Sequence, residues 1–276
     1  MQITESLRAQ EEVRATPAVS WLLCTHMVDE QLRLALQSCL EQTFSDFELL
    51  IVANGTAAGW VADRVAQWVG HDDRVRVFKT EVRYLPFSLS LGLHHARAPL
   101  VARMDSDDLS KPDRLQQQVD YFRTHPEVAV LGTAYEVIDS AGKVLHTVQL
   151  PQSNTDIRHA MRIRNPLCHP SVMFRREIVL DAGAYIGGLL AEDYDLWVRL
   201  AADPNVKFAN LSAICLSYRD VGVGGGRGAR AAYAAVAAAQ LREFLLGGGL
   251  SWLGGAFLSI FKSIVRSRPR QAAPRE

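Results

Sequence analysis

The sequence has few cysteines and no surplus of charge. Its four cysteines, Cys24, Cys39, Cys168 and Cys215, are far apart and lie in apolar surroundings. No CxxC pair is present, so neither a zinc site nor a redox motif is indicated. Buried, reduced thiols in a cytoplasmic protein are expected instead. Lys and Arg number 30, as do Asp and Glu, which leaves no polyanion-binding signature, and no nucleic-acid partner is expected.

Long apolar runs are also scarce. Residues 1–17 are polar and charged, and we interpret them as an extension without the apolar core of a secretory signal. A stretch without charge runs from Phe244 to Phe261, whereas a membrane-spanning helix takes about 20 apolar residues. The basic "KSIVRSRPR" follows it, so we expect peripheral contact of residues 244–270 with the inner face of the cytoplasmic membrane, through an interfacial helix. The alternative is a helical hairpin buried in a homodimer.

Strands and helices are predicted to alternate through the first half of the chain. Short apolar runs of strand length recur at 19–25, 47–53, 74–78 and 99–104. Apolar residues at helical spacing lie between them, and a further helix is predicted after Ser110, which would cap it, with Pro112 in its first turn. This alternation indicates right-handed βαβ units and an α/β fold with a mostly parallel sheet.

From about residue 128 the pattern changes. Two runs joined by a short turn, 128–139 and 144–150, are typical of antiparallel strands. The further elements expected along the chain are helices at 155–163 and 176–181, a helix starting near Glu192, two late strands at 206–210 and 213–219, a flexible glycine-rich loop at 222–228, and an alanine-rich helix at 230–244.

Three carboxylates, Asp105, Asp107 and Asp108, directly follow the strand predicted at 99–104. Ligands bind beyond the carboxyl ends of strands in parallel sheets. Carboxylates this close are costly unless a cation lies among them, and oxygen ligands suit Mg²⁺ or Mn²⁺, which completes its shell with substrate phosphates. The alternative is a solvated acidic turn that caps the next helix.

A second acidic cluster, Glu192, Asp193 and Asp195, begins a predicted helix in "AEDYDLW". One interpretation is that these residues only complement the helix dipole, and for Asp195 this could be the whole role. Two acidic clusters at loop–helix junctions also suit a metal site that faces a general base.

The motifs "VSWLLCTHMVDEQLRLALQSCLEQTFSDFELLIVANGT", "ARMDSDDLSKPDRLQQQVDYF", "NPLCHPSVMFRR" and "AEDYDLWVRLA" together resemble family-2 glycosyltransferases of the GT-A fold. The bacterial members that build surface polysaccharide and lipopolysaccharide are the most similar in pattern. The resemblance covers residues 18–220, with a nucleotide-sugar half at 18–127 and an acceptor half at 128–220. We expect a separate C-terminal part at 221–276, made of a glycine-rich loop and a helical tail in contact with the membrane. It implies a Rossmann-like, mostly parallel sheet with helices on both faces and a small antiparallel region on the acceptor side.

The resemblance implies an inverting hexosyltransferase-type enzyme that moves a sugar from a nucleoside-diphosphate donor to a hydroxyl of a saccharide or lipid-linked acceptor. Asp105 and Asp107 match the ends of the family's DxD motif, and Asp108 extends it. These carboxylates would hold Mg²⁺ or Mn²⁺ against the donor diphosphate. Asp193 matches the general base, and Glu192 would contact the acceptor.

Other residues match donor-binding positions of the family. Thr25, His26 and Asn54 lie where the nucleoside is seated. Arg103 could pair with the acid cluster or with a donor phosphate. His169 in "CHPS" could contact the donor or acceptor, or be a structural histidine.

The sequence departs from the family pattern in three places. The turn after the first strand reads "CTHM", and the acidic pair that contacts the base is replaced by Ala53 and Asn54, although a UDP-linked donor is still expected. No histidine follows "YR", where Asp220 could substitute as a metal ligand. Two alternatives therefore stay open: a catalytically degenerate nucleotide-sugar-binding member, and a metal-dependent nucleotidyltransferase, against which no glycine-rich phosphate loop follows the first strand.

Overall fold

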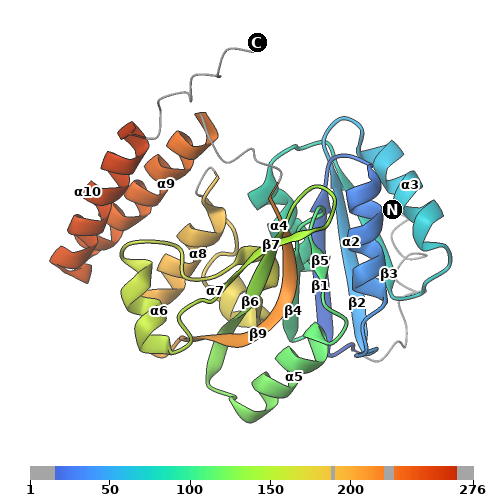
Figure 1. Ribbon diagram of the computed structural model, residues 1–276, viewed down its shortest axis with the longest axis horizontal. Coiled ribbons are helices and arrows are strands. Elements are labelled where there is room, and N and C mark those ends of the chain that lie inside the picture. Colours follow the sequence, from blue (N-terminus) through green and yellow to red (C-terminus); the bar gives the residue numbers. More distant parts are fainter. Residues whose placement is uncertain (1–15, 188–189, 221–226, 266–276) are drawn as a thin grey trace, which may run out of the picture.

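A nine-stranded sheet forms the centre of the computed structural model, which describes residues 16–187, 190–220 and 227–265 (Figure 1). The strand order is β3-β2-β1-β4-β8-β6-β9-β5, and β7 pairs with β6. The strands are β1 (Val19–Thr25), β2 (Phe47–Asn54), β3 (Val75–Thr80), β4 (Leu100–Met104), β5 (Leu109–Ser110), β6 (Val128–Ile138), β7 (Val144–Val148), β8 (Met173–Arg175) and β9 (Lys207–Arg219).

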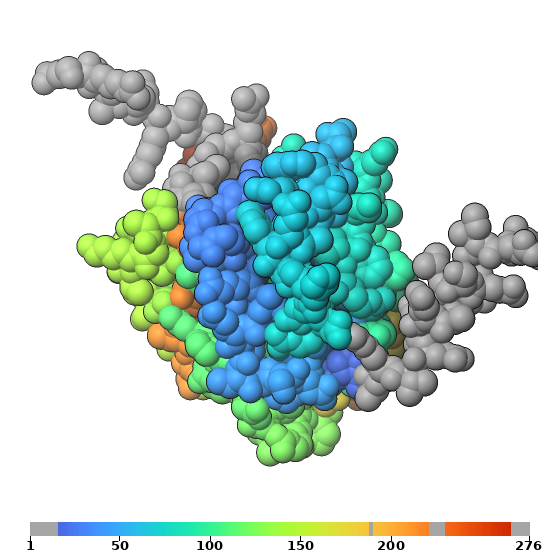
Figure 2. Space-filling view, turned by 90° about the vertical axis from the view of Figure 1, so that its right-hand side faces the viewer, coloured from blue at the N-terminus to red at the C-terminus, as the bar shows by residue number. Residues whose placement is uncertain are grey.

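Helices cover both faces of this sheet. The helices are α2 (Glu30–Leu40), α3 (Ala58–Val69), α4 (Leu85–His95), α5 (Arg114–Thr124), α6 (Asn154–Met161), α7 (Arg176–Asp181), α8 (Glu192–Ala201), α9 (Arg227–Glu243) and α10 (Leu250–Val265). Apolar side chains of α2, α3 and α5 pack on one face, and those of α4, α6, α7 and α8 pack on the other. Figure 2 views the molecule from the α2 and α3 side, where blue to cyan residues form the surface.

Six of the strands run in the same direction. Strands β1 to β4 are parallel to one another, and β8 is antiparallel to both β4 and β6. Because β8 is antiparallel to both of its neighbours, β6 runs in the same direction as β4. Strand β9 is parallel to β6. The carboxyl ends of β1, β2, β4, β6 and β9 therefore share one edge of the sheet. The expected α/β fold, with a mostly parallel sheet, helices on both faces and an antiparallel part in the second half, is confirmed.

Two local predictions were wrong. Ser110 does not cap α5, because Leu109–Ser110 pairs with Ser217 and Leu216 of β9, and the helix begins only at Arg114. Ser110, which the capping pattern assigned to the helix, is thus part of a strand pair with β9. The two late strands are one, β9, which stays continuous while its register against β6 shifts near Ala134.

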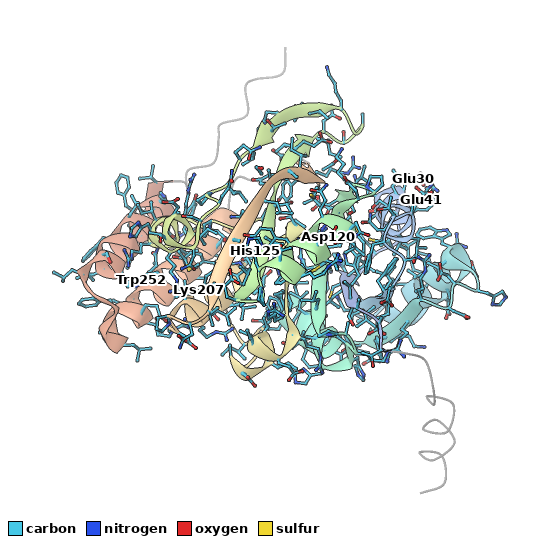
Figure 3. All side chains as sticks on the ribbon, turned by 90° about the horizontal axis from the view of Figure 1, so that it is seen from below. Glu30, Glu41, Asp120, His125, Lys207 and Trp252 are labelled. Carbon is cyan, nitrogen blue, oxygen red and sulfur yellow. The ribbon has the colours of Figure 1, made fainter. Side chains whose placement is uncertain are left out.

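The apolar stretch near the C-terminus is not a single helix. The chain leaves α9 through a π-turn at Phe244–Gly248, and Gly247 and Gly249 both have φ 93°, which only glycine adopts readily. Helix α10 then packs back along α9 as a hairpin. The hairpin lies at the end of the molecule opposite α2; Figure 3 labels Trp252 on α10 and Glu30 on α2. Within the part of the chain that the structure describes, no helix has the length and apolar character needed to cross a bilayer.

Three expectations concern residues outside the described ranges. These are most of the polar extension at 1–17, the glycine-rich loop over 221–226, and the basic residues after Val265.

Candidate active site

The first acidic cluster follows β4 at the shared carboxyl edge. One carboxylate oxygen of each of Asp105, Asp107 and Asp108 lies within 4.8 Å of the others. Across the described ranges, no other three histidine, cysteine or acidic side chains come together in this way. The loop after β4 therefore gathers the three carboxylates that the sequence singled out.

Asp108 is buried, and the last residue of β9 holds it. Its Oδ1 accepts a hydrogen bond from the backbone N of Arg219 at 2.8 Å, whereas its Oδ2 has no hydrogen-bond partner in the described part of the chain. The Arg219 side chain continues the clamp, because Nε donates to the Asp107 carbonyl at 2.8 Å and Nη1 donates to the Asp139 carbonyl at 2.9 Å. Burial and the nearby Asp105 carboxylate raise the pKa of both Asp107 and Asp108.

Arg103 lies behind this cluster and is only 3% exposed. Its Nη2 pairs with Asp105, while Nε and Nη1 have no hydrogen-bond partner among the described residues. Burial opposes the charge of the guanidinium, but the Asp105 carboxylate outweighs burial and raises the pKa of Arg103. A permanent positive charge with free donors is thus held directly beside the three carboxylates.

The donor set fits a divalent cation. Close carboxylates such as Asp107 and Asp108, whose pKa burial and a neighbouring carboxylate raise, are stabilised by positive charge, and Mg²⁺ and Mn²⁺ prefer oxygen ligands. The buried Oδ2 of Asp108, which lacks a partner, is the kind of atom that such an ion satisfies.

The second acidic cluster lies in the first turn of α8. Asp193 Oδ2 accepts a hydrogen bond of 2.6 Å from Asn165 Nδ2, and burial raises the pKa of Asp193. Burial also raises the pKa of Glu192 to about 7, with a smaller contribution from Asp193 and opposing attraction to Arg103. Attraction to Arg103 opposes the rise in pKa of both residues, so the two acidic clusters lie within electrostatic range of one guanidinium.

His169 and Tyr185 join the same region. His169 Nε2 and the Tyr185 hydroxyl are 3.0 Å apart, and both side chains are buried. Burial, assisted by Arg103, lowers the pKa of His169 well below its ordinary value, so the imidazole is neutral at pH 7. Sequence reasoning assigned no role to Tyr185 or to Asn165, although Asn165 begins the motif "NPLCHPSVMFRR", because neither side chain is charged.

The three residues expected around the nucleoside lie at the ends of β1 and β2. The Thr25 hydroxyl donates to the Met27 carbonyl at 2.9 Å and closes the turn, and Asn54 is buried at the end of its strand. His26 is exposed, and partial burial and the charge of Arg83 lower its pKa. Arg83 was also missed from the sequence.

Asp195 and Asp220 differ in environment. Asp195 is buried and forms ion pairs with Arg199 at 2.9 Å and Arg242 at 2.6 Å, which goes beyond complementing a helix dipole. Asp220 is exposed, its backbone N donates to the Ile138 carbonyl at 2.9 Å, and it does not belong to the group of three close carboxylates.

Comparison with known proteins identifies the family of the chain. Residues 20–182 match the family model described as glycosyl transferase family 2. The chain is 33% identical to the O-antigen biosynthesis glycosyltransferase WbnJ of Escherichia coli over 234 residues, which cover 84% of this chain and 91% of WbnJ.

Solved structures share the fold at low sequence identity. The mannosyltransferase PcManGT from Pyrobaculum calidifontis, in complex with GDP-Man and Mn²⁺, gives a TM-score of 0.60 at 14% identity, covering 96% of this chain and 78% of its own. S. aureus TarS in complex with UDP-GlcNAc gives a TM-score of 0.59 at 16% identity, covering 81% and 66%. The fold is GT-A, and the chain belongs to glycosyl transferase family 2.

Proposed function

We propose that the protein transfers a sugar, with inversion, from a nucleoside-diphosphate donor to a hydroxyl group of a saccharide or lipid-linked acceptor in surface-polysaccharide synthesis. The observation that carries the proposal is the arrangement of two acidic clusters around Arg103 at the carboxyl edge of the sheet. One cluster suits a diphosphate with its cation, and the other suits deprotonation of an acceptor.

Asp193 is the proposed general base. The hydrogen bond from Asn165 orients its carboxylate, and its raised pKa increases its basicity toward the acceptor hydroxyl. Glu192, with a pKa of about 7, is proposed to contact the acceptor. When the acceptor hydroxyl attacks the anomeric carbon from the side of Asp193, the nucleoside diphosphate leaves from the opposite face of the sugar. The configuration at the anomeric carbon is thereby inverted.

Asp105, Asp107 and Asp108 would hold Mg²⁺ or Mn²⁺, which supplies electrostatic stabilisation of the leaving diphosphate when bound. The free donors of Arg103 add positive charge from the protein itself. The neutral His169 and the Tyr185 hydroxyl offer hydrogen bonds to sugar hydroxyls without adding charge.

The donor class is supported by the neighbours. TarS binds UDP-GlcNAc and PcManGT binds GDP-Man, and both share the fold of this chain. UDP stays the expected nucleotide, with GDP as the alternative to test. The relation to WbnJ, an O-antigen biosynthesis enzyme, supports a cell-surface saccharide acceptor.

The test is a thermal-shift screen of UDP-GlcNAc and GDP-Man with and without Mn²⁺, followed by a transfer assay with the donor that binds. A ligand that binds only the folded state raises the melting temperature. Asp193→Asn should lower transfer at least about 100-fold while donor binding with Mn²⁺ is kept. The matched control is Asp181→Asn at an exposed aspartate of α7. Full transfer by the Asp193 variant would rule out the base assignment.

The same assays separate the alternatives. Binding without turnover on any acceptor would favour a degenerate nucleotide-sugar-binding protein. Release of pyrophosphate instead of a nucleoside diphosphate would favour a nucleotidyltransferase.

We also propose that the outer face of α10 lies on a membrane surface. Its inward side buries Trp252 with small and polar residues, whereas its outward side is apolar: Leu250, Phe257, Phe261 and Ile264 are each more than 60% exposed. The basic sequence "KSIVRSRPR" starts in the last turn of α10 at Lys262, which suits anionic lipid.

The double substitution Phe257→Ser with Phe261→Ser should reduce sedimentation with anionic vesicles of phosphatidylglycerol and phosphatidylcholine. Trp60→Ser, at an exposed tryptophan of α3, is the matched control. Unchanged sedimentation of the double variant would contradict the proposal, and loss of dimers instead would indicate contact between two copies of the chain.

A further inference from the structure

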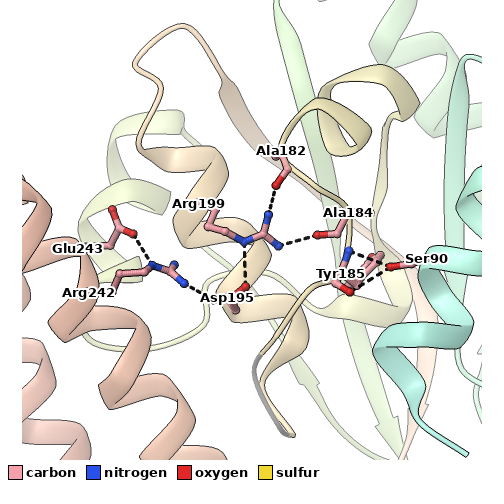
Figure 4. A network of polar contacts seen from close by, with 8 residues as sticks. All are labelled: Ser90, Ala182, Ala184, Tyr185, Asp195, Arg199, Arg242 and Glu243. Atoms are coloured by element: carbon pink, nitrogen blue, oxygen red, sulfur yellow. Dashed lines mark hydrogen bonds and ion pairs between the residues drawn. The ribbon is translucent and has the colours of Figure 1, made fainter.

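The C-terminal hairpin is joined to α8 by an ion-pair network that centres on the buried Asp195 carboxylate and includes the half-buried Arg242. Asp195 lies two residues after Asp193 on α8, and its Oδ1 accepts from Arg242 Nη1 of α9 at 2.6 Å. Arg242 also pairs with Glu243 at 3.2 Å, which holds the guanidinium in place on its own helix. Figure 4 shows these contacts running from α9 to α8.

The same carboxylate continues the network toward the active site. Asp195 Oδ2 accepts from Arg199 Nε at 2.9 Å, and Arg199 donates to the carbonyls of Ala182 and, at 2.6 Å, Ala184 (Figure 4). Ala184 has φ 56°, a left-handed conformation that a non-glycine residue adopts only when its surroundings hold it. Arg199 therefore fixes a backbone segment that would relax without it.

That segment ends at Tyr185, which reaches the site. The Tyr185 backbone N donates to Ser90 Oγ of α4 at 3.2 Å, and Ser90 donates back to the Tyr185 carbonyl at 3.0 Å. The Tyr185 hydroxyl is 3.0 Å from His169 Nε2. A continuous set of polar contacts thus leads from Arg242 of the hairpin to the His169–Tyr185 pair.

A second route ends on the other side of Asp193. Gln240 of α9 is fully buried, and its Nε2 donates to the Tyr194 hydroxyl at 2.9 Å and to the Arg162 carbonyl at 3.0 Å. Helix α10 touches the same carbonyl, because a Cβ on Gly255 would lie 2.1 Å from it. Three residues beyond Arg162 lies Asn165, the hydrogen-bond donor to Asp193.

We infer that the α9–α10 hairpin is a positioning element of the active site, and that Arg242 and Asp195 set the placement of the α8 carboxylates and of Tyr185. A buried carboxylate shared by two arginines from different elements fixes their relative position, since losing one arginine leaves half of the carboxylate's ion pairing unmade. The inference deepens the proposed function, and it gives the hairpin a role in transfer that is separate from contact with a membrane.

The first test is hydrogen–deuterium exchange of the whole protein without ligand, which does not depend on the proposed function. Arg242→Ala should speed exchange of the Ala184 and Tyr185 amides at least tenfold and leave the β1–β2 amides unchanged. Arg242→Lys should restore most of the protection. Arg230→Ala, at an exposed arginine of the same helix, is the matched control and should have no effect.

The second test is kinetic and rests on the proposed function. Release of nucleoside diphosphate from UDP-GlcNAc or GDP-Man with Mn²⁺ should show a kcat at least tenfold lower in Arg242→Ala, with donor KM changed less than twofold. Arg242→Lys should recover the rate.

The two tests fail in different ways. Exchange that is unchanged in Arg242→Ala, or faster throughout the sheet, would overturn the positioning role, even if the protein is an active glycosyltransferase. If Arg242→Ala does not fold, Asp195→Asn keeps the side-chain volume, removes both ion pairs and should give the same local exchange. Absence of turnover in every form, with the local exchange effect present, would count against the proposed function alone.

Discussion

Replacing Glu192 with glutamine should stabilise the protein above pH 7 and leave its stability unchanged below about pH 4.5. Burial raises the pKa of Glu192 from 4.5 to about 7, so the folded state holds a proton that the unfolded chain has lost between these values. The stability of the protein therefore falls as pH rises through this window, and the full cost is present above pH 7. Glutamine does not titrate and lacks this cost.

The magnitude follows from the two pKa values. The rise from 4.5 to about 7 corresponds to about 3.4 kcal/mol at about 1.4 kcal/mol per pKa unit. Glu192 is partly exposed, and solvent screening reduces the effect to about 1–2 kcal/mol. For a chain of this size we expect a rise in melting temperature of about 2–4 °C at pH 8.

Melting curves of both proteins from pH 4.5 to pH 8.5 measure the effect, because groups common to both largely cancel in the difference. Glu81→Gln, at an exposed glutamate, is the control and should show no such pH dependence. A Glu192→Gln protein that is less stable than wild type at pH 8, or equally shifted at every pH, would refute the reasoning.

Three further predictions concern the rest of the chain. Gly255→Ala should lower stability by about 1–3 kcal/mol in thermal melts, because the new Cβ would meet the Arg162 carbonyl at 2.1 Å, whereas Gly254→Ala, with open space around it, should not; equal effects would contradict the packing argument. Glu48→Gln should lower the free energy of unfolding by about 2 kcal/mol in urea unfolding at pH 7, because hydrogen bonds and ion pairs outweigh burial and lower the pKa of Glu48. The stability difference from wild type should shrink as pH falls below 4.5, where the carboxylate of Glu48 is protonated. A stability difference that is the same at every pH would contradict this prediction. The Cys39 thiol, whose pKa burial raises to about 12, should resist iodoacetamide at pH 8 until the protein unfolds, as mass spectrometry would show; rapid labelling of the folded protein would disprove its burial.

Much of the fold could be predicted because its signals are local. The strands β1, β2 and β4 are short and mostly apolar. Helix α2 carries buried residues at helical spacing after an Asp29 cap, whose Oδ1 accepts from the Leu32 N at 2.8 Å. The alternation of these elements was enough to predict the parallel sheet. The failure at Ser110 has a non-local cause, since pairing with β9 is invisible in a window of a few residues.

The candidate site divides in the same way. The acidic clusters were found from the sequence because charges next to an apolar strand or at a helix start stand out. Asn165, Tyr185 and Arg219 were not assigned a role, since each acts through a partner distant in sequence. The contact of Arg242 with Asp195 could not be predicted either, because the sequence of the C-terminal tail indicated only an alanine-rich helix.

The clamp of Arg219 on the acid loop has a consequence for synthesis of the protein. Asp108 receives its hydrogen bond from a residue 111 positions later in the chain. On the ribosome, β1 to β4 emerge first and can pair with one another, but the acid loop must wait for the whole of β9. Closing so long a loop is slow, and until then the three carboxylates repel one another without their clamp. We therefore expect that the nascent chain gains the proposed donor binding only after Arg219 has emerged, and that fragments ending before this residue fold in part and do not bind UDP-GlcNAc or GDP-Man.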